Sequence, residues 1–224
     1  MTHHTASIFF ILVAYLFGSL PIGLMVGRMV KGIDVRDHGS GNIGASNVWR
    51  TLGPLWGIVV FLFDFCKGYL PTLLARGIPV TPGWLPVPHV ATTPFNVPDW
   101  LPVAVGLAAI LGHNFSPFLK FSGGKGVATS LGVAFGLSPT AAIVGFGVWL
   151  LCLLATRTIS ISSMVGAVAA SLVLVFYHHD TAHLAFAVLV TLSVILKHRP
   201  NMTRLKAHTE PKVTFPWTPK LSTP

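Results

Sequence analysis

Long apolar segments with almost no charged residues are the feature that most restricts how this chain can fold. A helix needs about 20 mostly apolar residues to cross a bilayer. Charged residues make up only 9% of the 224 residues, against roughly 25% in an ordinary soluble domain. The chain is therefore predicted to be an all-α integral membrane protein. Its apolar runs cover residues 7–30, 52–74, 100–119, 127–137, 141–155, 161–177 and 181–196.

The run at 127–137 is too short to cross a membrane by itself. At 1.5 Å per residue it spans about 16 Å, against a hydrocarbon core of ~30 Å. We expect it either to pack as a short helix with the run at 141–155 or to form a re-entrant pair with it. Both arrangements return the chain to the same side of the membrane. The prediction is about seven transmembrane helices, one of them short, or five full spans and a helical hairpin.

The excess of basic residues indicates an orientation. The formal net charge is +9, which in a soluble protein would favour nucleic-acid binding; the long apolar runs argue against that. With the N-terminus outside, 13 of the 15 lysines and arginines fall in cytoplasmic segments, as the positive-inside rule requires. We therefore expect an external N-terminus and a cytoplasmic C-terminus. If residues 127–155 crossed the membrane only once, all later segments would change sides and the basic residues would no longer be concentrated on one side.

The chain is interpreted as a single polytopic domain, residues 1–224. Its first run has no basic segment before it and is followed by further spans, so we expect a retained span and not a signal peptide. Residues 77–98 are uncharged and rich in proline, which predicts an irregular extracytoplasmic loop. Residues 211–224 are expected to form a flexible cytoplasmic tail. Cys66 and Cys152 lie in apolar runs and are expected to be buried hydrophobic residues.

A polar stretch, GSGNIGASN, starts at residue 39 and is followed by Arg50. Its glycines permit positive φ angles and close approach of the backbone, so that several N–H groups can converge on an anion. A helix through Asn47 would direct its positive dipole end to the same place. A plain flexible turn is the alternative.

A second glycine-rich stretch, Gly123-Gly124-Lys125-Gly126, precedes an apolar run. A lysine between glycines at the start of a helix suits phosphate binding. The stretch is not a Walker A loop, because no Ser or Thr follows the lysine. The alternative is a tight turn whose lysine only obeys the positive-inside rule.

The third polar cluster is KHRPNMTR, starting at residue 197 and followed by Glu210. Pro200 is tolerated in the first turn of a short interfacial helix, on which His198 and Asn201 can face one way. A lipid-headgroup anchor is the alternative. Ser160 and Ser163 form a weaker cluster at the entrance of a span, where hydroxyls often only satisfy backbone groups.

Two further groups of residues each allow a functional and a structural interpretation. Asp64 and Lys67 lie three residues apart inside a predicted span, where ionisable residues are candidates for function; their spacing equally allows a self-contained ion pair. His178, His179 and His183 at an external turn offer metal ligands, but ordinary surface histidines are the commoner case.

The absence of several catalytic motifs restricts the reactions that this chain is expected to catalyse. The sequence has no G-x-S-x-G motif and no histidine followed five positions later by aspartate. The cytoplasmic segments are short of carboxylates, which argues against paired-carboxylate catalysis. Cationic side chains, glycine N–H groups, serine and asparagine remain, and these bind phosphates and stabilise developing negative charge. Such a set suits an already activated substrate with an anionic leaving group, and we expect no cofactor and no metal.

From Gly18 to Glu210 the chain resembles the bacterial acyl-phosphate:glycerol-3-phosphate acyltransferases of the PlsY type, integral membrane enzymes of phospholipid synthesis. The resemblance is carried by GSGNIGASNVWRTLG at 39–53, DFCKG at 64–68, FLKFSGGKGVAT at 118–129 and KHRPNMTRL at 197–205. Departures are the loop at 77–98, Ser46 and Trp49 in place of commoner residues, and His208 where the family usually has glycine.

The resemblance implies transfer of a fatty acyl group from acyl phosphate to the sn-1 hydroxyl of glycerol 3-phosphate, which gives lysophosphatidic acid and phosphate. This is the first acylation of phospholipid synthesis, expected at the cytoplasmic face of the bacterial inner membrane. Acyl-CoA and acyl-carrier protein are not direct donors. Expected partners are the two substrates and membrane lipids, with room for association with other enzymes of phospholipid synthesis and no role for nucleic acid.

The resemblance also implies which residues act. Catalytic roles fall on Ser40, Arg50, Lys125, His198 and Asn201. Substrate-binding roles fall on Gly39, Gly41, Asn42, Gly123, Gly124, Gly126, Ser160, Ser163 and Glu210, with Ser160 the better match to a further active-site serine and Ser163 the alternative. We expect direct attack by the substrate hydroxyl without an acyl-enzyme, and which motif holds which phosphate stays open.

The main alternative function is a carrier for phosphorylated metabolites that uses the same basic face as a vestibule. Carriers typically have internal repeats and polar residues near mid-membrane, whereas the polar motifs here fall on one predicted face. A membrane-anchored nucleic-acid or partner-binding protein is a third alternative, and the sequence shows no soluble module for it.

Overall fold

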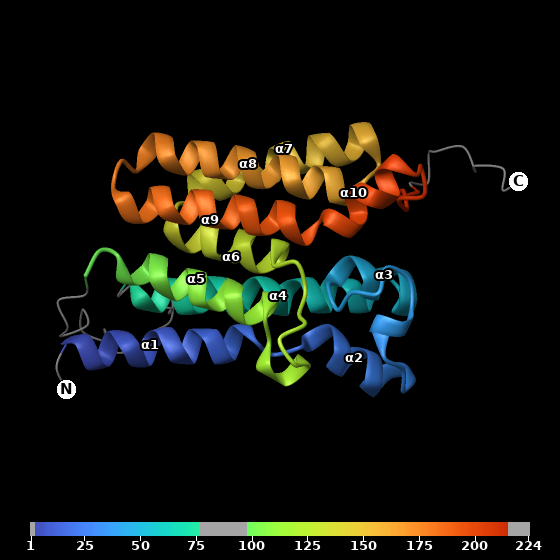
Figure 1. Ribbon diagram of the computed structural model, residues 1–224, viewed down its shortest axis with the longest axis horizontal. Helices are drawn as coiled ribbons and strands as arrows, with labels where there is room; N and C mark the ends of the chain where they lie inside the picture. The colour runs from blue at the N-terminus through green and yellow to red at the C-terminus, as the bar shows by residue number, and fades with distance from the viewer. Residues whose placement is uncertain (1–2, 77–97, 215–224) are drawn as a thin grey trace, which may run out of the picture.

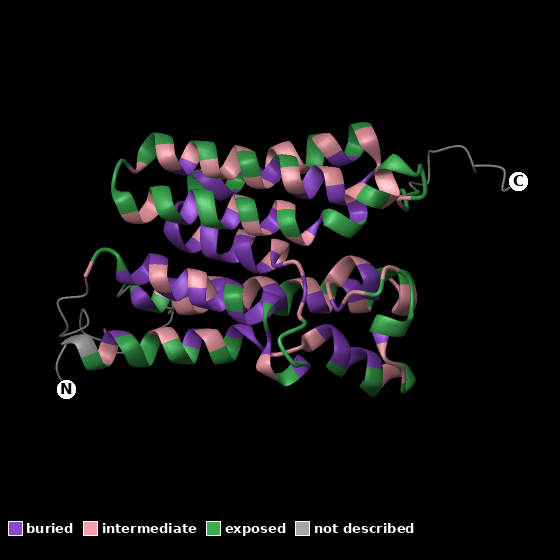
Figure 2. Cartoon of the chain, viewed as in Figure 1, coloured by how far each residue is buried: buried purple, intermediate pink, exposed green. Residues whose placement is uncertain are grey.

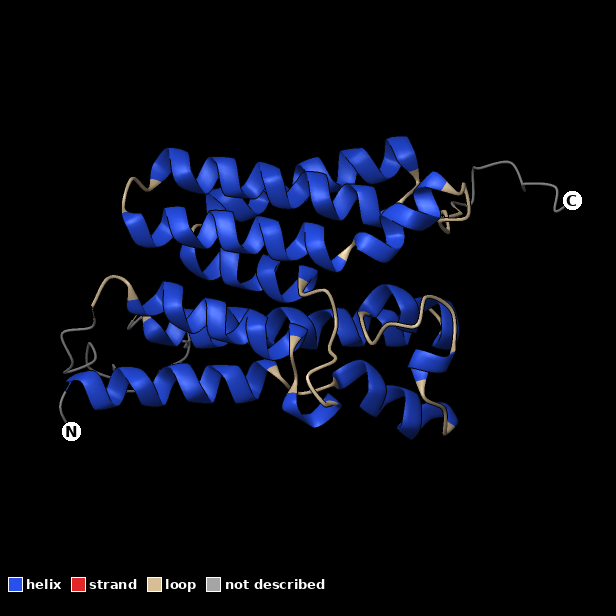
Figure 3. Ribbon diagram, viewed as in Figure 1, coloured by secondary structure: helices blue, strands red, loops and turns tan. Residues whose placement is uncertain are grey.

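The computed structural model describes residues 3–76 and 98–214, and all of their regular structure is helical (Figure 3). Most of the predicted loop at 77–98 and of the tail at 211–224 lies outside these residues. The helices are α1 (His3–Gly18), α2 (Ile22–Lys31), η1 (Val35–Asp37), α3 (Ala45–Leu52), α4 (Pro54–Ala75), α5 (Leu101–Asn114), η2 (Pro117–Leu119), α6 (Val127–Leu137), α7 (Pro139–Thr156), α8 (Ile159–Tyr177), α9 (Thr181–Lys197) and α10 (Arg199–Lys206).

The helices have the length and surface of membrane spans. Five helical segments of the described residues are long and apolar enough to cross a bilayer, or six if the bent pair α9–α10 counts as one span. Large apolar side chains such as Leu172 and Phe176 are exposed, and many exposed residues follow the helices on the outside of the bundle (Figure 2). Contiguous apolar surface of this kind is typical of contact with lipid. The protein is an all-helical integral membrane protein.

The first apolar run counts as one candidate span, Thr5–Lys31, but it contains a break that was not predicted from the sequence. α1 ends at Gly18 and α2 begins at Ile22. Pro21 has no N–H to continue the helical ladder, and side chains from other helices bind the carbonyls at the break. Ser116 Oγ donates to Ser19 O at 2.7 Å, and Lys67 Nζ donates to Leu20 O at 3.2 Å.

The short run at 127–137 forms α6 with the predicted bounds. Ser138 ends it and caps α7 through its Oγ, which accepts the Ala141 N–H. α6 packs closely on α4, since a Cβ added at Gly68 or Gly132 would overlap backbone of the other helix. Small residues at such crossings let membrane helices approach each other. α7 runs back beside α6 (Figure 1), an arrangement compatible with both of the alternatives expected for this pair.

The two ends of the helix bundle differ in charge. One end carries the start of α1, the end of α4 and the α8–α9 turn, with Arg76 and Asp180 (Figure 1). The other end carries the end of α2, η1, α3, the α7–α8 connection and α10, with basic residues that include Arg28, Arg50 and Arg204. Most of the predicted cytoplasmic segments therefore gather at one end, with the first and third motifs, whereas the connection between α5 and α6, which carries the second motif, lies nearer the middle of the bundle (Figure 1).

Candidate active site

The bend between α9 and α10 places the third motif against the bundle. The two helices are bent by 50° at His198, and Pro200 occupies the first turn of α10, as predicted for a short interfacial helix. His198 and Asn201 are both buried. His198 Nδ1 lies 2.7 Å from Val194 O. Because a carbonyl oxygen only accepts, Nδ1 carries the hydrogen of the neutral ring, and Nε2 is left as an acceptor.

Lys125 and Asn201 join the second and third motifs. Lys125 Nζ donates to Asn201 Oδ1 at 2.7 Å, and Asn201 Nδ2 donates to Glu210 Oε1 at 2.6 Å. The other carboxylate oxygen of Glu210 accepts from Arg204 Nε at 2.8 Å. The motifs thus form one hydrogen-bonded chain of alternating donors and acceptors. Glu210, predicted to bind substrate, here contacts protein groups and fixes the orientation of Asn201 and Arg204.

Several cations surround this chain. Burial lowers the pKa of the Lys125 ammonium to about 8, with Arg204 and Arg50 acting in the same direction and Glu210 opposing them. Burial also lowers the pKa of the Arg50 guanidinium, which stays charged. Burial alone would raise the pKa of the Glu210 carboxyl, but hydrogen bonds from Asn201 and Arg204, with Ser160 acting in the same direction, hold it below its ordinary value. Three cations against one carboxylate make a site for anions.

The structure separates the two candidate serines. Ser160 lies beside Glu210 and is among the groups that lower the pKa of its carboxyl. Ser163 donates to Ile159 O at 2.8 Å and lies 3.4 Å from Trp149 Nε1, which belongs to α7. The position of Ser160 beside Glu210 therefore makes it a better candidate than Ser163 for a further active-site serine.

The loop at 123–126 rests on the end of α5. Gly123 N–H donates to Asn114 O at 3.2 Å and Gly124 N–H to His113 O at 3.0 Å. A Cβ at Gly124 would overlap His113 Nε2, and Gly126 has a φ of +77° at the N-cap of α6. These glycines are required by packing and backbone conformation. Two of the N–H groups expected to bind an anion are instead used to hold the loop.

The first motif is held together by Asn47. Its Nδ2 donates to the carbonyls of Val35, His38 and Asn42, while its Oδ1 accepts the Ser40 N–H at 2.7 Å. Gly39 and Gly41 adopt positive φ angles of +59° and +68°.

Three N–H groups of this loop also have partners inside the protein. Besides the Ser40 N–H, the Gly41 N–H bonds to His38 O and the Gly44 N–H to Asn42 Oδ1. The loop therefore offers Ser40, and Arg50 on the following helix α3, through side chains more than through a backbone cradle.

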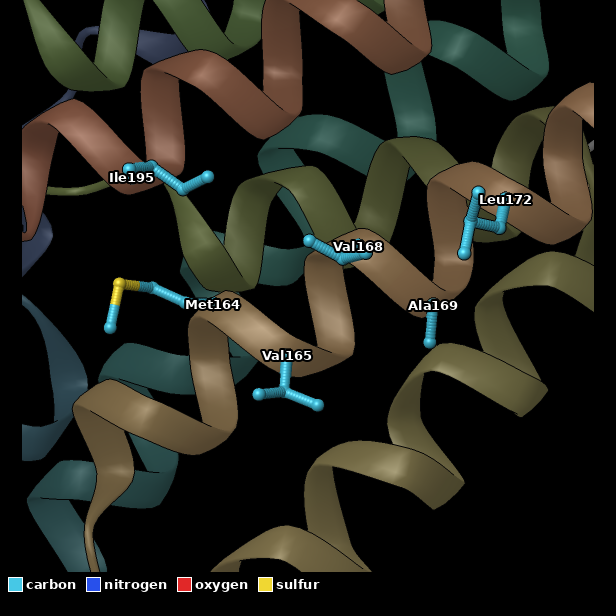
Figure 4. Close-up of a pocket in the computed structure, with 6 residues that line it drawn as sticks. All are labelled: Met164, Val165, Val168, Ala169, Leu172 and Ile195. Atoms are coloured by element: carbon cyan, nitrogen blue, oxygen red, sulfur yellow. The ribbon is translucent and has the colours of Figure 1, made fainter.

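A groove of about 390 Å³ lies along α8, beside Ile195 of α9. Figure 4 shows Met164, Val165, Val168, Ala169 and Leu172 on α8, with Ile195 on α9. Met164 follows Ser160 by one helical turn, and Ile195 precedes His198 by three residues. On α8 and at the end of α9, residues of the polar site are therefore followed or preceded within one helical turn by residues that line the groove.

The sequence-based prediction missed four residues around the site. Arg204 was noted only as a basic residue, although it follows Asn201 by three positions and so shares a face of α10. Asn47 acts as the clamp of the first loop, and His113 and Asn114 support the second. A buried polar residue beside a glycine-rich loop was the available signal for these three.

Asp64 and Lys67 form the predicted ion pair. Lys67 Nζ lies 2.6 Å from Asp64 Oδ1, and His113 Nδ1 lies 3.6 Å from the same oxygen, with all three side chains buried. This group lies within the bundle, behind the loop at 123–126. Its ion-pair contacts include neither Lys125 nor Asn201.

Three residues at the opposite end also come together. The ligand atoms of His178, Asp180 and His183 lie within 4.8 Å of one another. The rings of the two histidines stack at 4.2 Å with an interplanar angle of 10°. A metal ion lies in the plane of each imidazole that binds it, so two parallel rings do not converge on one ion in this arrangement.

Comparisons with known proteins agree with one another. Residues 8–208 match the family described as glycerol-3-phosphate acyltransferase. Glycerol-3-phosphate acyltransferases of Desulforudis audaxviator and Trichlorobacter lovleyi are 41% and 44% identical to the chain. The alignments cover 90% and 93% of this chain, and 93% and 98% of theirs.

A solved structure is similar as well. The crystal structure of PlsY (YgiH), an integral membrane glycerol 3-phosphate acyltransferase, in its glycerol 3-phosphate form has a TM-score of 0.82 and 36% identity. The match covers 93% of this chain and 96% of that one. Its lysophosphatidic acid form has a TM-score of 0.79.

Proposed function

The chain belongs to the glycerol-3-phosphate acyltransferase family, and on this premise we propose that its acyl donor is acyl phosphate. The protein transfers the acyl group to the sn-1 hydroxyl of glycerol 3-phosphate and releases lysophosphatidic acid and phosphate. One observation supports this proposal: several positive charges gather around one carboxylate. Lys125 binds the buried Asn201. The charges of Arg50 and Arg204 lower the pKa of Lys125, and the charge of Glu210 raises it. Such a site favours two phosphorylated substrates.

The leaving phosphate binds Lys125 at the start of α6. Its Nζ already binds an oxygen acceptor, Asn201 Oδ1, at 2.7 Å, and the positive end of the α6 dipole lies next to it. Arg50, with Ser40 and Asn42, binds the phosphate of glycerol 3-phosphate. Charge-assisted bonds to both phosphates hold the hydroxyl and the acyl carbon together, and positioning of this kind supplies a large part of a catalytic barrier reduction.

The acyl group moves in one direct substitution at the carbonyl carbon. The sn-1 hydroxyl oxygen forms the new ester bond, and the bond from the carbonyl carbon to the phosphate oxygen breaks. The phosphate leaves with the electron pair of that bond, and the hydroxyl proton passes to a substrate phosphate. Protein groups therefore orient the reactants and stabilise charge, and no acyl-enzyme forms.

Asn201 and His198 act on the reacting atoms. Glu210 accepts one of the two amide hydrogens of Asn201, and the other donates to the oxyanion that develops on the carbonyl oxygen. His198 Nε2 is free to accept a hydrogen bond, because Nδ1 donates to Val194 O. It binds the second hydroxyl of glycerol 3-phosphate and so orients the sn-1 hydroxyl, whose own proton goes to the substrate phosphate.

The acyl chain lies in the groove between α8 and α9. The groove is lined by apolar side chains, and its near end, at Met164 and Ile195, adjoins Ser160 and His198 in sequence. An acyl chain there leaves the reacting carbonyl at the polar chain and its methylenes within the bilayer.

The site faces the cytoplasm of a bacterial inner membrane. Support comes from the gathering of predicted cytoplasmic segments, with their basic residues, at the end that carries α3 and α10. Residues 1–224 act as a single domain of seven transmembrane helices, and other enzymes of phospholipid synthesis are candidate neighbours in the membrane.

Purified protein in detergent tests the donor. Palmitoyl phosphate and glycerol 3-phosphate should give lysophosphatidic acid and phosphate in equal amounts. Palmitoyl-CoA and palmitoyl-acyl-carrier protein, supplied separately at the same concentration, should give no product. Equal rates with a thioester donor would overturn the proposed donor but not the family.

A further inference from the structure

A buried charged group lies behind the glycine loop that presents Lys125. Asp64 and Lys67 are 3% and 2% exposed, and His113 is 4% exposed. Lys67 Nζ lies 2.6 Å from Asp64 Oδ1. The acyl-transfer mechanism uses none of the three, although burying charged groups within a membrane protein carries a considerable cost.

The ion pair is anchored to the break between α1 and α2. Lys67 Nζ donates to Leu20 O at 3.2 Å in addition to its bond with Asp64. The next residue on α4, Gly68, packs against the backbone of Thr129 in α6. The pair thus has a fixed place relative to α1, α4 and α6.

His113 connects this pair to the loop. Its Nδ1 lies 3.6 Å from Asp64 Oδ1, and its Nε2, on the other side of the ring, is so close to Gly124 that a Cβ there would overlap it. Its backbone carbonyl accepts the Gly124 N–H at 3.0 Å. Both the ring and the carbonyl of one residue therefore contact the residue that precedes Lys125.

We propose that His113 is a positioning residue for Lys125. The Asp64–Lys67 pair fixes the imidazole ring, the ring supports Gly124, and the loop then presents Lys125 Nζ to Asn201. This inference rests on the proposed role of Lys125 in binding a substrate phosphate. By this inference the buried cluster of Asp64, Lys67 and His113 helps to position a group that acts in the reaction, in addition to stabilising the fold.

A double-mutant cycle on kcat/KM separates these roles. H113A should lower kcat/KM for acyl phosphate about tenfold or more in the wild-type background, and by less than about threefold in K125A, because coupled residues are not additive. K125R, which keeps a cation at this position, should stay sensitive to H113A and therefore serves as the contrasting background. H113Q, which keeps a polar side chain, should lose less activity than H113A.

S116A is the matched control. Ser116 is also buried, just after the end of α5, and its hydroxyl bonds to the same break through Ser19 O and not to the glycine loop. S116A should stay within about threefold of wild type in every background, as expected for a site that is independent of Lys125. Thermal unfolding in detergent identifies variants that fail to fold.

The outcomes are distinguishable. If K125A keeps wild-type kcat/KM, the proposed role of Lys125 is wrong. If K125A is impaired and H113A lowers activity by the same factor in both backgrounds, the positioning role of His113 is wrong, while the proposed function stands.

Discussion

Lys125 Nζ lies 2.7 Å from Asn201 Oδ1, although the two residues are 76 positions apart in the chain. The contact joins the glycine loop before α6 to the short helix α10. It lets one amide bind a phosphate-binding cation through its oxygen and a carboxylate, Glu210, through its nitrogen. In the proposed mechanism, phosphate binding by Lys125 and oxyanion stabilisation by Asn201 are thus coupled through one side chain.

The charge of Lys125 predicts a pH profile. Its pKa of about 8 lies below the ordinary value of 10.5 because the ammonium is buried, so the charge is present at pH 7 and lost as the pH rises through 8. Above that pH, kcat/KM should fall by about tenfold per unit, since kcat/KM reports the ionisation of the free enzyme. In K125R this alkaline limb should disappear, because arginine stays charged. An unchanged limb in K125R would assign the titration to another group.

Loss of the Asn201 amide should slow the chemical step. N201A should reduce kcat by about 10²–10³, as for removal of one oxyanion donor. T203A on the same helix is the control, because Thr203 is exposed and its hydroxyl bonds only within α10, to Arg199 O. Steady-state kinetics at saturating substrates measure both. Full turnover in N201A would remove the residue from the reaction.

Glu210 should stabilise the fold above its pKa. E210A removes the acceptor of Asn201 and Arg204 and should cost about 2 kcal/mol, the scale of a hydrogen bond to a charged group. The folded-state pKa lies below the ordinary 4.5, so this stabilisation is present above pH 4.5 and is lost as the pH falls through the folded value. Thermal unfolding of wild type and E210Q in detergent, followed as the pH is lowered from 6 to about 3, should show a steeper acid loss in wild type. Parallel curves would contradict the ionised role.

The groove between α8 and α9 should recognise chain length. A169W fills it and should lower kcat/KM for hexadecanoyl phosphate about tenfold, with little change for hexanoyl phosphate, because each buried methylene contributes about 0.8 kcal/mol. V188W is the control, since Val188 is half exposed on α9 and does not line the groove. Equal losses for both donors would show that the chain lies elsewhere.

The sequence predicted those elements that local signals delimit. Gly126 and Ser138-Pro139 bound α6, and Pro200 marks the first turn of α10, so both helices were predicted with their place in the fold. The break at Leu20 was missed because the residues on either side are equally apolar. It is stabilised by Lys67 and Ser116, which lie far away in the chain.

The residues of the candidate site were easier to predict than their roles. Glycine-rich composition indicated anion binding, but Asn47, His113 and Asn114 bind the N–H groups that were expected to do it. His208 adopts a φ of +57° in the turn before Glu210. Glycine adopts this left-handed conformation freely, and histidine is among the other residues that tolerate it.

An isotope-exchange measurement tests direct transfer between the two bound phosphorylated substrates. Protein is incubated with palmitoyl phosphate and radiolabelled inorganic phosphate without glycerol 3-phosphate, and label in palmitoyl phosphate is followed. Direct transfer predicts no exchange above a no-enzyme blank, and equal amounts of lysophosphatidic acid and phosphate once glycerol 3-phosphate is added. Exchange at a rate comparable to turnover would show that an acyl-enzyme forms, and would contradict the mechanism built on Lys125, Asn201 and His198.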